Sequence, residues 1–153
     1  MNLILSQEWR NMNAKEAPIK ILLVEDNPGD FKLIQQMLKE SEHTLFKLIH
    51  VPKLETGLEH LQESKFDIII LDLNLPDSEG LDTFVQVLSK HPELPIIILT
   101  GLSDEEMGID AVKQGAQDYL VKGEFNGKLL VRSIHYAIER KRLEGIFSYH
   151  INR

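Results

Sequence analysis

Apolar residues along this chain fall into short, nearly unbroken runs and into longer stretches with helical spacing. The short runs lie at 19–24, 68–71 and 96–99 and consist mainly of Ile, Leu and Val. Such runs are typical of strands buried on both faces of a parallel sheet. The segment 45–51 alternates enough to predict a second, more peripheral strand, and 118–121 predicts the last of five strands.

The stretches that follow the strands place apolar residues on one helix face each. The residues expected to face inward are Phe31, Ile34, Met37 and Leu38; Leu54, Leu58 and Leu61; Leu81, Phe84, Val85 and Leu88; and, in a long last helix from about 127 to at least 141, Leu130, Val131, Ile134 and Ile138. We expect Asp30 to cap the first helix, Ser103 or Asp104 to begin the fourth, and Gly115 to end it. Strand and helix alternate five times, which predicts a doubly wound α/β domain.

The composition is that of a soluble globular domain of 153 residues, 42% hydrophobic and 27% charged. Seventeen basic and 24 acidic residues give a net charge of −7, which argues against direct binding of nucleic acid. The basic run 140–142 is better explained by the dipole at a helix C-terminus. The chain has no cysteine and no run long enough for a signal peptide or a membrane span, so we expect a cytoplasmic protein.

Four of the five predicted strands end on a side chain with functional chemistry. Glu25 and Asp26 follow the first strand, Asp72 ends the third, Thr100 the fourth and Lys122 the fifth. Because the carboxyl ends of parallel strands share one edge of a sheet, these side chains should converge there. The sequence therefore predicts an acidic pocket that also holds an ammonium and a hydroxyl.

Three carboxylates in one pocket repel one another, so they should be partly protonated or hold a cation. A site of oxygen ligands without His or Cys favours a hard ion such as Mg²⁺. An ion and an ammonium can neutralise the oxygens of a transferring phosphoryl group while a carboxylate attacks it. This combination of groups points to phosphoryl transfer.

The chain resembles the receiver domain of two-component response regulators over roughly residues 19–143. The matching positions are the acidic pair Glu25 and Asp26, the phosphoacceptor position Asp72 followed by Leu75, Pro76 and Gly80, the hydroxyl position Thr100, the switch aromatic Tyr119 and the lysine Lys122. The resemblance implies a flavodoxin-like (βα)5 fold with strand order 2-1-3-4-5. It leaves residues 1–18 as an N-terminal extension, which Trp9 could pin to the body, and residues 144–153 as a helical tail.

The resemblance also implies how the site works. Mg²⁺ would be held by Asp26, Asp72 and the backbone carbonyl of Asn74, with Glu25 acting directly or through water. Asp72 would take a phosphoryl group from a histidine kinase or a His-phosphotransfer protein. The protein would then be a phosphoacceptor switch rather than an enzyme that turns over a separate substrate.

In the same family, the hydroxyl and the lysine bind the phosphoryl oxygens, which here implies Thr100 and Lys122. Tyr119 would follow Thr100 inward and change a protein-binding surface formed by the fourth helix, the fifth strand and the last helix. The implied partners are a downstream protein or an output domain, and a homodimer is possible; neither nucleic acid nor a membrane is expected as a direct partner. One position departs from the family, because Gly123 follows Lys122 where a proline in a cis bond is usual, so the path of this loop is open.

Three other functions are compatible with parts of the pattern. A phosphohydrolase with a nucleophilic Asp72 would need a second carboxylate two residues later, where the chain has Asn74. A flavin- or nucleotide-binding module would need a glycine-rich loop after the first strand, where the chain has Glu25 and Asp26. A degenerate receiver that only binds protein would not need the complete set of site residues.

Overall fold

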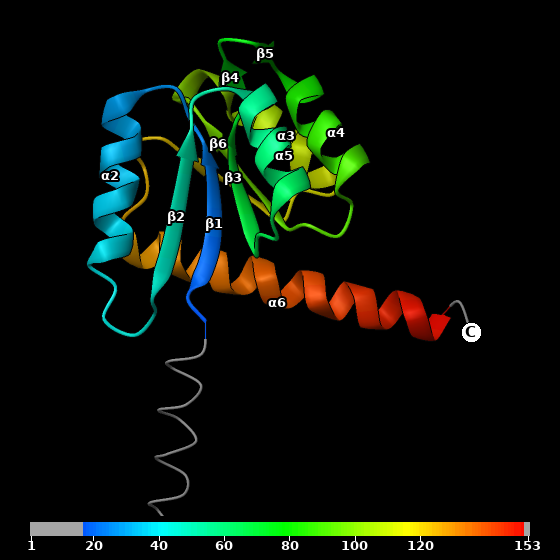
Figure 1. The fold of residues 1–153 in the computed structure, drawn as a ribbon. Coiled ribbons are helices and arrows are strands. Elements are labelled where there is room, and N and C mark those ends of the chain that lie inside the picture. The colour runs from blue at the N-terminus through cyan, green and yellow to red at the C-terminus, as the bar shows by residue number, and fades with distance from the viewer. Residues whose placement is uncertain (1–16, 152–153) are drawn as a thin grey trace, which may run out of the picture.

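A computed structural model describes residues 17–151, with side chains up to residue 146. Five strands form one parallel sheet in the order β2-β1-β3-β6-β7 (Figure 1), which confirms the predicted order 2-1-3-4-5. The strands are β1 (Ile19–Val24), β2 (Phe46–Val51), β3 (Ile68–Asp72), β6 (Ile96–Thr100) and β7 (Asp118–Val121). The segment 1–16, including Trp9, lies outside the described residues.

Helices cover both faces of the sheet, as expected for a doubly wound domain. They are α2 (Pro28–Lys39), α3 (Leu54–Glu63), α4 (Leu81–Lys90), α5 (Glu105–Lys113) and α6 (Gly127–Ile151). One face packs against α2 and α6, and the other against α3, α4 and α5 (Figure 1). Strands β3 and β6 lie in the middle of the sheet and are buried along their whole length. The strand that carries Asp72 is therefore held on all sides.

Two details of the predicted helices are wrong. Asn27, not Asp30, caps α2: its side chain accepts a hydrogen bond from the backbone N–H of Asp30 at 3.0 Å, and Pro28 occupies the first helical position. Val85 is 40% exposed, and Val87 is buried in its place. Val85 follows Phe84 in the chain, and Val87 precedes Leu88. Either valine can therefore belong to the apolar face of α4, and the sequence pattern alone could not say which of the two is buried.

A short hairpin and a 3₁₀ turn add to the predicted elements. The hairpin pairs β4 (Asn74–Leu75) with β5 (Ser78–Glu79) directly after β3. The turn η1 (Leu102–Asp104) precedes α5, so the predicted start at Ser103 or Asp104 falls in this turn, and α5 begins at Glu105 with Asp104 at its N-cap position. Both additions lie in loops at the carboxyl edge of the sheet.

Helix α6 is continuous from Gly127 to Ile151 and passes the expected boundary at residue 143. Leu130 and Ile134 are fully buried against the sheet, whereas Leu143 is 49% exposed. The basic run 140–142 therefore lies inside the helix rather than at its C-terminus, which corrects the expectation from sequence. No helix in the described part of the chain is both long and apolar enough to span a membrane.

Candidate functional site

The register of the sheet brings the predicted site residues together at its carboxyl edge. Val24 pairs with Leu71, Asp72 with Leu99 and Thr100 with Val121, so the ends of four neighbouring strands are level. They open into a pocket of about 1070 Å³. Its lining includes the predicted residues Asp26, Asp72, Asn74, Thr100 and Lys122.

Lys122 is the centre of the charge network in this pocket. Its Nζ lies 2.6 Å from Oδ2 of Asp72, 2.9 Å from Oε2 of Glu25 and 3.0 Å from Oδ2 of Asp30. Burial alone would lower the pKa of Lys122, but hydrogen bonds to these three carboxylates raise it above its ordinary value. The side chain is therefore an ammonium held by three carboxyl groups.

Glu25, Asp26 and Asp72 form the acidic cluster of the pocket. Each offers one carboxylate oxygen, and these oxygens lie within 4.8 Å of one another, so the three residues could hold a metal ion. Glu25 and Asp72 are 0% and 4% exposed, whereas Asp26 is exposed. An open position beside two buried carboxylates suits Mg²⁺, which keeps several of its waters when bound.

Glu25 carries the largest resolved pKa shift of the acidic residues. Burial, followed by the hydrogen bond and charge of the neighbouring Asp72, raises the pKa of Glu25 from 4.5 to about 8. Its Oε2 is buried and accepts no hydrogen bond from the described residues, although Nζ of Lys122 is near. An oxygen in this state is a suitable ligand for a cation or for a water molecule bound to one.

Thr100 and Tyr119 lie beside each other, but they point to different surroundings. Thr100 is 2% exposed, and its Oγ1 has no hydrogen-bond partner among the described residues. The hydroxyl of Tyr119 donates to Oε1 of Glu105 at 2.9 Å, and this carboxylate raises the pKa of Tyr119. The Thr100 hydroxyl is thus available to a group in the pocket, whereas Tyr119 is bound to the surface of α5.

The loop after Lys122 follows a path without a cis peptide bond, since none occurs in the described residues. Gly123 instead adopts a φ of +84°, a left-handed conformation that a residue with a side chain rarely takes. The glycine therefore turns the chain at the position where the family usually has proline, and Lys122 still reaches the acidic cluster.

Two acidic residues of this edge have contacts that the sequence did not reveal. Asp30, expected as a cap, pairs with Lys122. Asp77, in the turn of the β4–β5 hairpin, accepts hydrogen bonds from the backbone N–H groups of Leu54 and Glu55, both at 2.9 Å. These bonds cap α3, whose own N-cap residue supplies no side-chain bond, and they fix the hairpin that follows Asp72.

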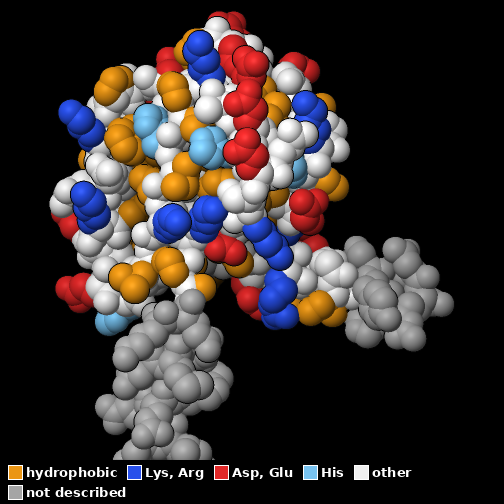
Figure 2. All heavy atoms as spheres, viewed as in Figure 1, with side chains coloured by type: hydrophobic (Ala, Val, Ile, Leu, Met, Phe, Trp, Pro, Cys, Tyr) orange, Lys and Arg blue, Asp and Glu red, His pale blue; other side chains and the backbone are white. Residues whose placement is uncertain are grey.

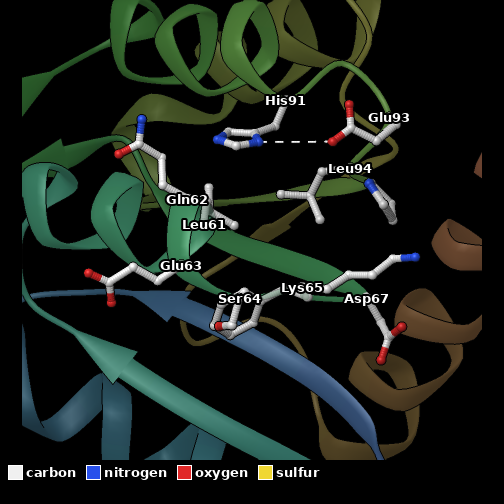
Figure 3. A pocket seen from close by; sticks show the side chains of 11 residues that line it. Leu61, Gln62, Glu63, Ser64, Lys65, Asp67, His91, Glu93 and Leu94 are labelled. Carbon is white, nitrogen blue, oxygen red and sulfur yellow. Dashed lines mark ion pairs between the residues drawn. The ribbon is translucent and has the colours of Figure 1, made fainter.

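A second hollow, of about 510 Å³, lies at the opposite edge of the sheet (Figure 3). It is lined by the ends of α3 and α4 and by residues just before β3 and β6. Its rim carries a His91–Glu93 pair 3.9 Å apart, and none of its polar side chains is buried. None of the predicted site residues lines this hollow, so the candidate chemistry gathers at the carboxyl edge.

Comparison with known proteins agrees with this geometry. Residues 21–134 match the model of the response regulator receiver domain. The chain is 32% identical over 107 residues to the chemotaxis protein CheY of Listeria monocytogenes, an alignment that covers 68% of this chain and 86% of that protein. It is 30% identical over 124 residues to the cell cycle transcriptional regulator CtrA of Caulobacter vibrioides, covering 81% of this chain and 52% of CtrA.

Among solved structures, a response regulator receiver domain protein from Clostridium thermocellum superimposes with a TM-score of 0.71 at 29% identity. That match covers 81% of this chain and 97% of the other. The family model spans more than half of the chain, and the sheet order, the acidic cluster and the strand-end residues are those expected from the sequence resemblance. The chain belongs to the response regulator receiver domain family.

Proposed function

We propose that this chain is a Mg²⁺-dependent phosphoacceptor switch in which Asp72 receives the phosphoryl group. The observation that carries the proposal is the pairing of a buried Asp72 with Lys122 at 2.6 Å, next to a buried Thr100 hydroxyl that has no partner among the described residues. A nucleophilic carboxylate, a cation and a free hydroxyl donor are the groups that phosphoryl transfer to Asp requires.

The transfer itself is a displacement at phosphorus. A carboxylate oxygen of Asp72 forms a bond to phosphorus while the bond between phosphorus and the donor's leaving atom breaks, and the leaving group keeps the electron pair. The donor is a phosphohistidine of a kinase or a His-phosphotransfer protein, or a small acyl phosphate. Lys122 neutralises charge on the phosphoryl oxygens, and Thr100 Oγ1 donates to one of them.

Asp26 and Asp72, with the backbone carbonyl of Asn74 and with Glu25 directly or through water, would hold Mg²⁺. The ion supplies charge neutralisation for the phosphoryl oxygens. The fit rests on the chemistry of the donors, which are all oxygens, and on the buried Oε2 of Glu25 without a hydrogen bond. The chain's own contribution is to hold three carboxylates in one pocket despite their repulsion, which Lys122 offsets.

The switching surface lies on α5, β7 and α6. Tyr119 of β7 connects it to the site, because its ring and the methyl group of Thr100 both lie against Gly108 of α5, and its hydroxyl is bound to Glu105 at the start of that helix. Exposed apolar residues on the two helices and the turn before α5 are available to a partner: Leu102, Ile109, Val112 and Tyr136. We propose that phosphorylation moves Tyr119 inward and changes the affinity of this surface for a downstream protein, an output domain or a second copy of the chain.

A phosphohydrolase fits the geometry less well. The position two residues after Asp72 is Asn74, whose amide cannot deliver and retrieve a proton as a general acid. In the structure its backbone N–H donates to Oδ1 of Asp72 at 2.8 Å, so this residue holds the acceptor in place.

The test is the intact mass of the protein after incubation with acetyl phosphate, with and without Mg²⁺. We expect a gain of one phosphoryl group that depends on Mg²⁺ in the wild type and is absent in Asp72→Asn. Asp82→Asn, a change at an exposed aspartate on α4, is the matched control and should be phosphorylated normally. Phosphorylation of Asp72→Asn at the wild-type rate would refute the assignment of the acceptor.

A further inference from the structure

Among the residues that the structure describes, Asp30 is the one partner of Lys122 that lies outside the acidic cluster. Lys122 contacts three carboxylates, and two of them, Glu25 and Asp72, belong to the cluster that could hold a metal ion. The third, Asp30, lies 3.0 Å from Nζ and is not a member of that cluster. The ammonium of Lys122 thus contacts both the acidic cluster and the carboxylate of Asp30, which lies outside that cluster.

The start of α2 explains how Asp30 reaches this position. Asn27 caps the helix by accepting a hydrogen bond from the N–H of Asp30, and Pro28 fixes the first helical residue. Asp30 therefore sits in the first turn, directly after the loop that carries Asp26. Its side chain is 32% exposed, and that of Lys122 is 26% exposed, so the pair lies at the rim of the pocket.

An ammonium and a divalent cation compete for carboxylate oxygens, because like charges repel and each oxygen has few lone pairs to share. Lys122 now uses oxygens of Glu25 and Asp72 that the proposed metal site also needs. The carboxylate of Asp30 reduces this competition, since it offers Lys122 an anionic partner outside the cluster.

We propose that Asp30 is a positioning residue that holds Lys122 at the rim of the site and so keeps the carboxylates of the cluster available to Mg²⁺. The inference rests on the proposed Mg²⁺-dependent function. Asp30 also lies where it favours the dipole of α2, but that role affects helix stability and does not act through Lys122.

The experiment is a double-mutant cycle on Mg²⁺ affinity, measured by titration of the metal-free protein and followed by backbone amide shifts in NMR. The cycle uses Asp30→Asn, Lys122→Gln and the double variant, each checked for folding by thermal melting. Asp104→Asn is the control for loss of one negative charge, because Asp104 lines the same pocket and makes no ion pair in the described part of the chain. Asp30→Glu, which restores the carboxylate, tests for rescue.

We expect the Kd for Mg²⁺ of Asp30→Asn to be at least about three times the Kd of Asp104→Asn. The Asp30→Glu variant should recover most of the wild-type affinity for Mg²⁺. In the Lys122→Gln background, the effect of Asp30→Asn should shrink by about threefold or more, which is within the range of coupling between contacting groups. A merely structural role would change the melting temperature without this coupling.

Equal or larger effects of Asp30→Asn in the Lys122→Gln background would overturn the inference, because Asp30 would then act on the ion directly. No effect in either background would overturn it as well. A wild-type protein that does not bind Mg²⁺ would refute the proposed metal site together with the inference, whereas normal wild-type binding without coupling would refute the inference alone.

Discussion

Glu25 is the fully buried member of the acidic cluster. In the metal-free protein its ionised carboxylate lowers the free energy of unfolding, because the charge is buried beside Asp72. Its carboxylate lies beside that of Asp72, and burial raises its pKa to about 8. The folded protein therefore binds a proton at Glu25 more readily than the unfolded chain does, whose value is near 4.5. Stability is lost as the pH rises from about 4.5 to about 8, because over this range the folded protein keeps a proton on Glu25 that the unfolded chain has released.

Replacing Glu25 by Gln should stabilise the metal-free protein and weaken Mg²⁺ binding. The amide keeps the shape of the side chain and removes the buried charge, so the free energy of unfolding should rise by about 1–3 kcal/mol at pH 8. The gain should diminish toward pH 5, where Glu25 of the wild type is protonated in the folded state. Urea unfolding of the wild type and of Glu25→Gln, in EDTA and at several pH values, measures this difference in the free energy of unfolding.

Glu59→Gln, at an exposed position of α3, serves as the control for this prediction and should change stability little at any pH. A Glu25→Gln protein that is less stable than the wild type across the whole range would show that the pair with Lys122 outweighs the cost of burial.

The sequence predicted the position of a site residue correctly where that residue lies at the end of a strand. Asp72, Thr100 and Lys122 follow apolar runs, and the parallel sheet carries each run to the same edge. Asp30 was not recognised as part of the site, because a carboxylate near a helix start has an ordinary explanation as a cap. Its contact with Lys122 joins residues 92 positions apart in the chain, and local patterns contain no signal for it.

At the scale of elements, helix α5 packs closely on Tyr119 of β7, the residue proposed as the switch. A Cβ added to Gly108 would lie 2.9 Å from Cγ and Cδ2 of Tyr119 and 3.1 Å from Cγ2 of Thr100. Real Cβ atoms do not approach so closely, so the absence of a side chain at Gly108 lets the helix rest on the Tyr119 ring. The Tyr119 ring can occupy its observed position only because residue 108 is a glycine.

Gly108→Ala should therefore lower the melting temperature and displace the Tyr119 ring. Overpacking costs about 1–3 kcal/mol, which outweighs the helix propensity of about 1 kcal/mol that alanine gains over glycine. Gly145→Ala is a matched control, because nothing lies within 4 Å of a Cβ at that position of α6. It should raise the melting temperature slightly, and an equal rise for Gly108→Ala would contradict the close packing.

The hairpin after β3 shows which elements the sequence could not predict. Its strands are two residues each, too short to produce a hydrophobic period. It is held instead by side-chain hydrogen bonds: Asp77 binds the start of α3, more than twenty residues earlier in the chain, and the hydroxyls of Ser78 and Thr83 lie 2.6 Å apart. Elements defined by such contacts appear only once the chain is folded.

At the scale of the whole molecule, charge is distributed unevenly and α6 extends away from the body. Figure 2 shows acidic side chains in a row over α3 and a group of Lys and Arg near the edge where the strands begin. The basic run 140–142 of α6 has partners within the chain: Arg140 donates to the carbonyl of Gln117 at 2.9 Å, Lys141 pairs with Glu144, and Arg142 pairs with Glu139. Each residue of this basic run therefore has a contact within the chain.

The last hydrogen bond between α6 and the body that the described residues record is donated by Gln117 to the carboxylate of Glu144, at 3.2 and 3.3 Å. Ile146 beyond it is 44% exposed. A chain ended after Glu144 should therefore melt within about 2 °C of the full chain, because Ile146, the apolar residue beyond Glu144 whose side chain is described, buries little surface. This tests the proposed boundary between the receiver domain and a tail that begins at residue 144.

Thermal melting of both chains at the same protein concentration measures the difference, and repeating it over a range of concentrations controls for association. A fall of more than about 5 °C that does not depend on concentration would mean that the tail packs on the domain. A fall that depends on concentration would assign the tail to contact between two copies.

The sequence by itself determined the five strands, their covering helices and the set of residues at the carboxyl edge, because buried runs and helical periods are local signals. The tertiary structure decided which carboxylates share Lys122, how Gly123 turns the loop, and where Tyr119 rests on α5. These features depend on distances between segments far apart in the chain. Packing sets such distances, and no local pattern of residues contains them.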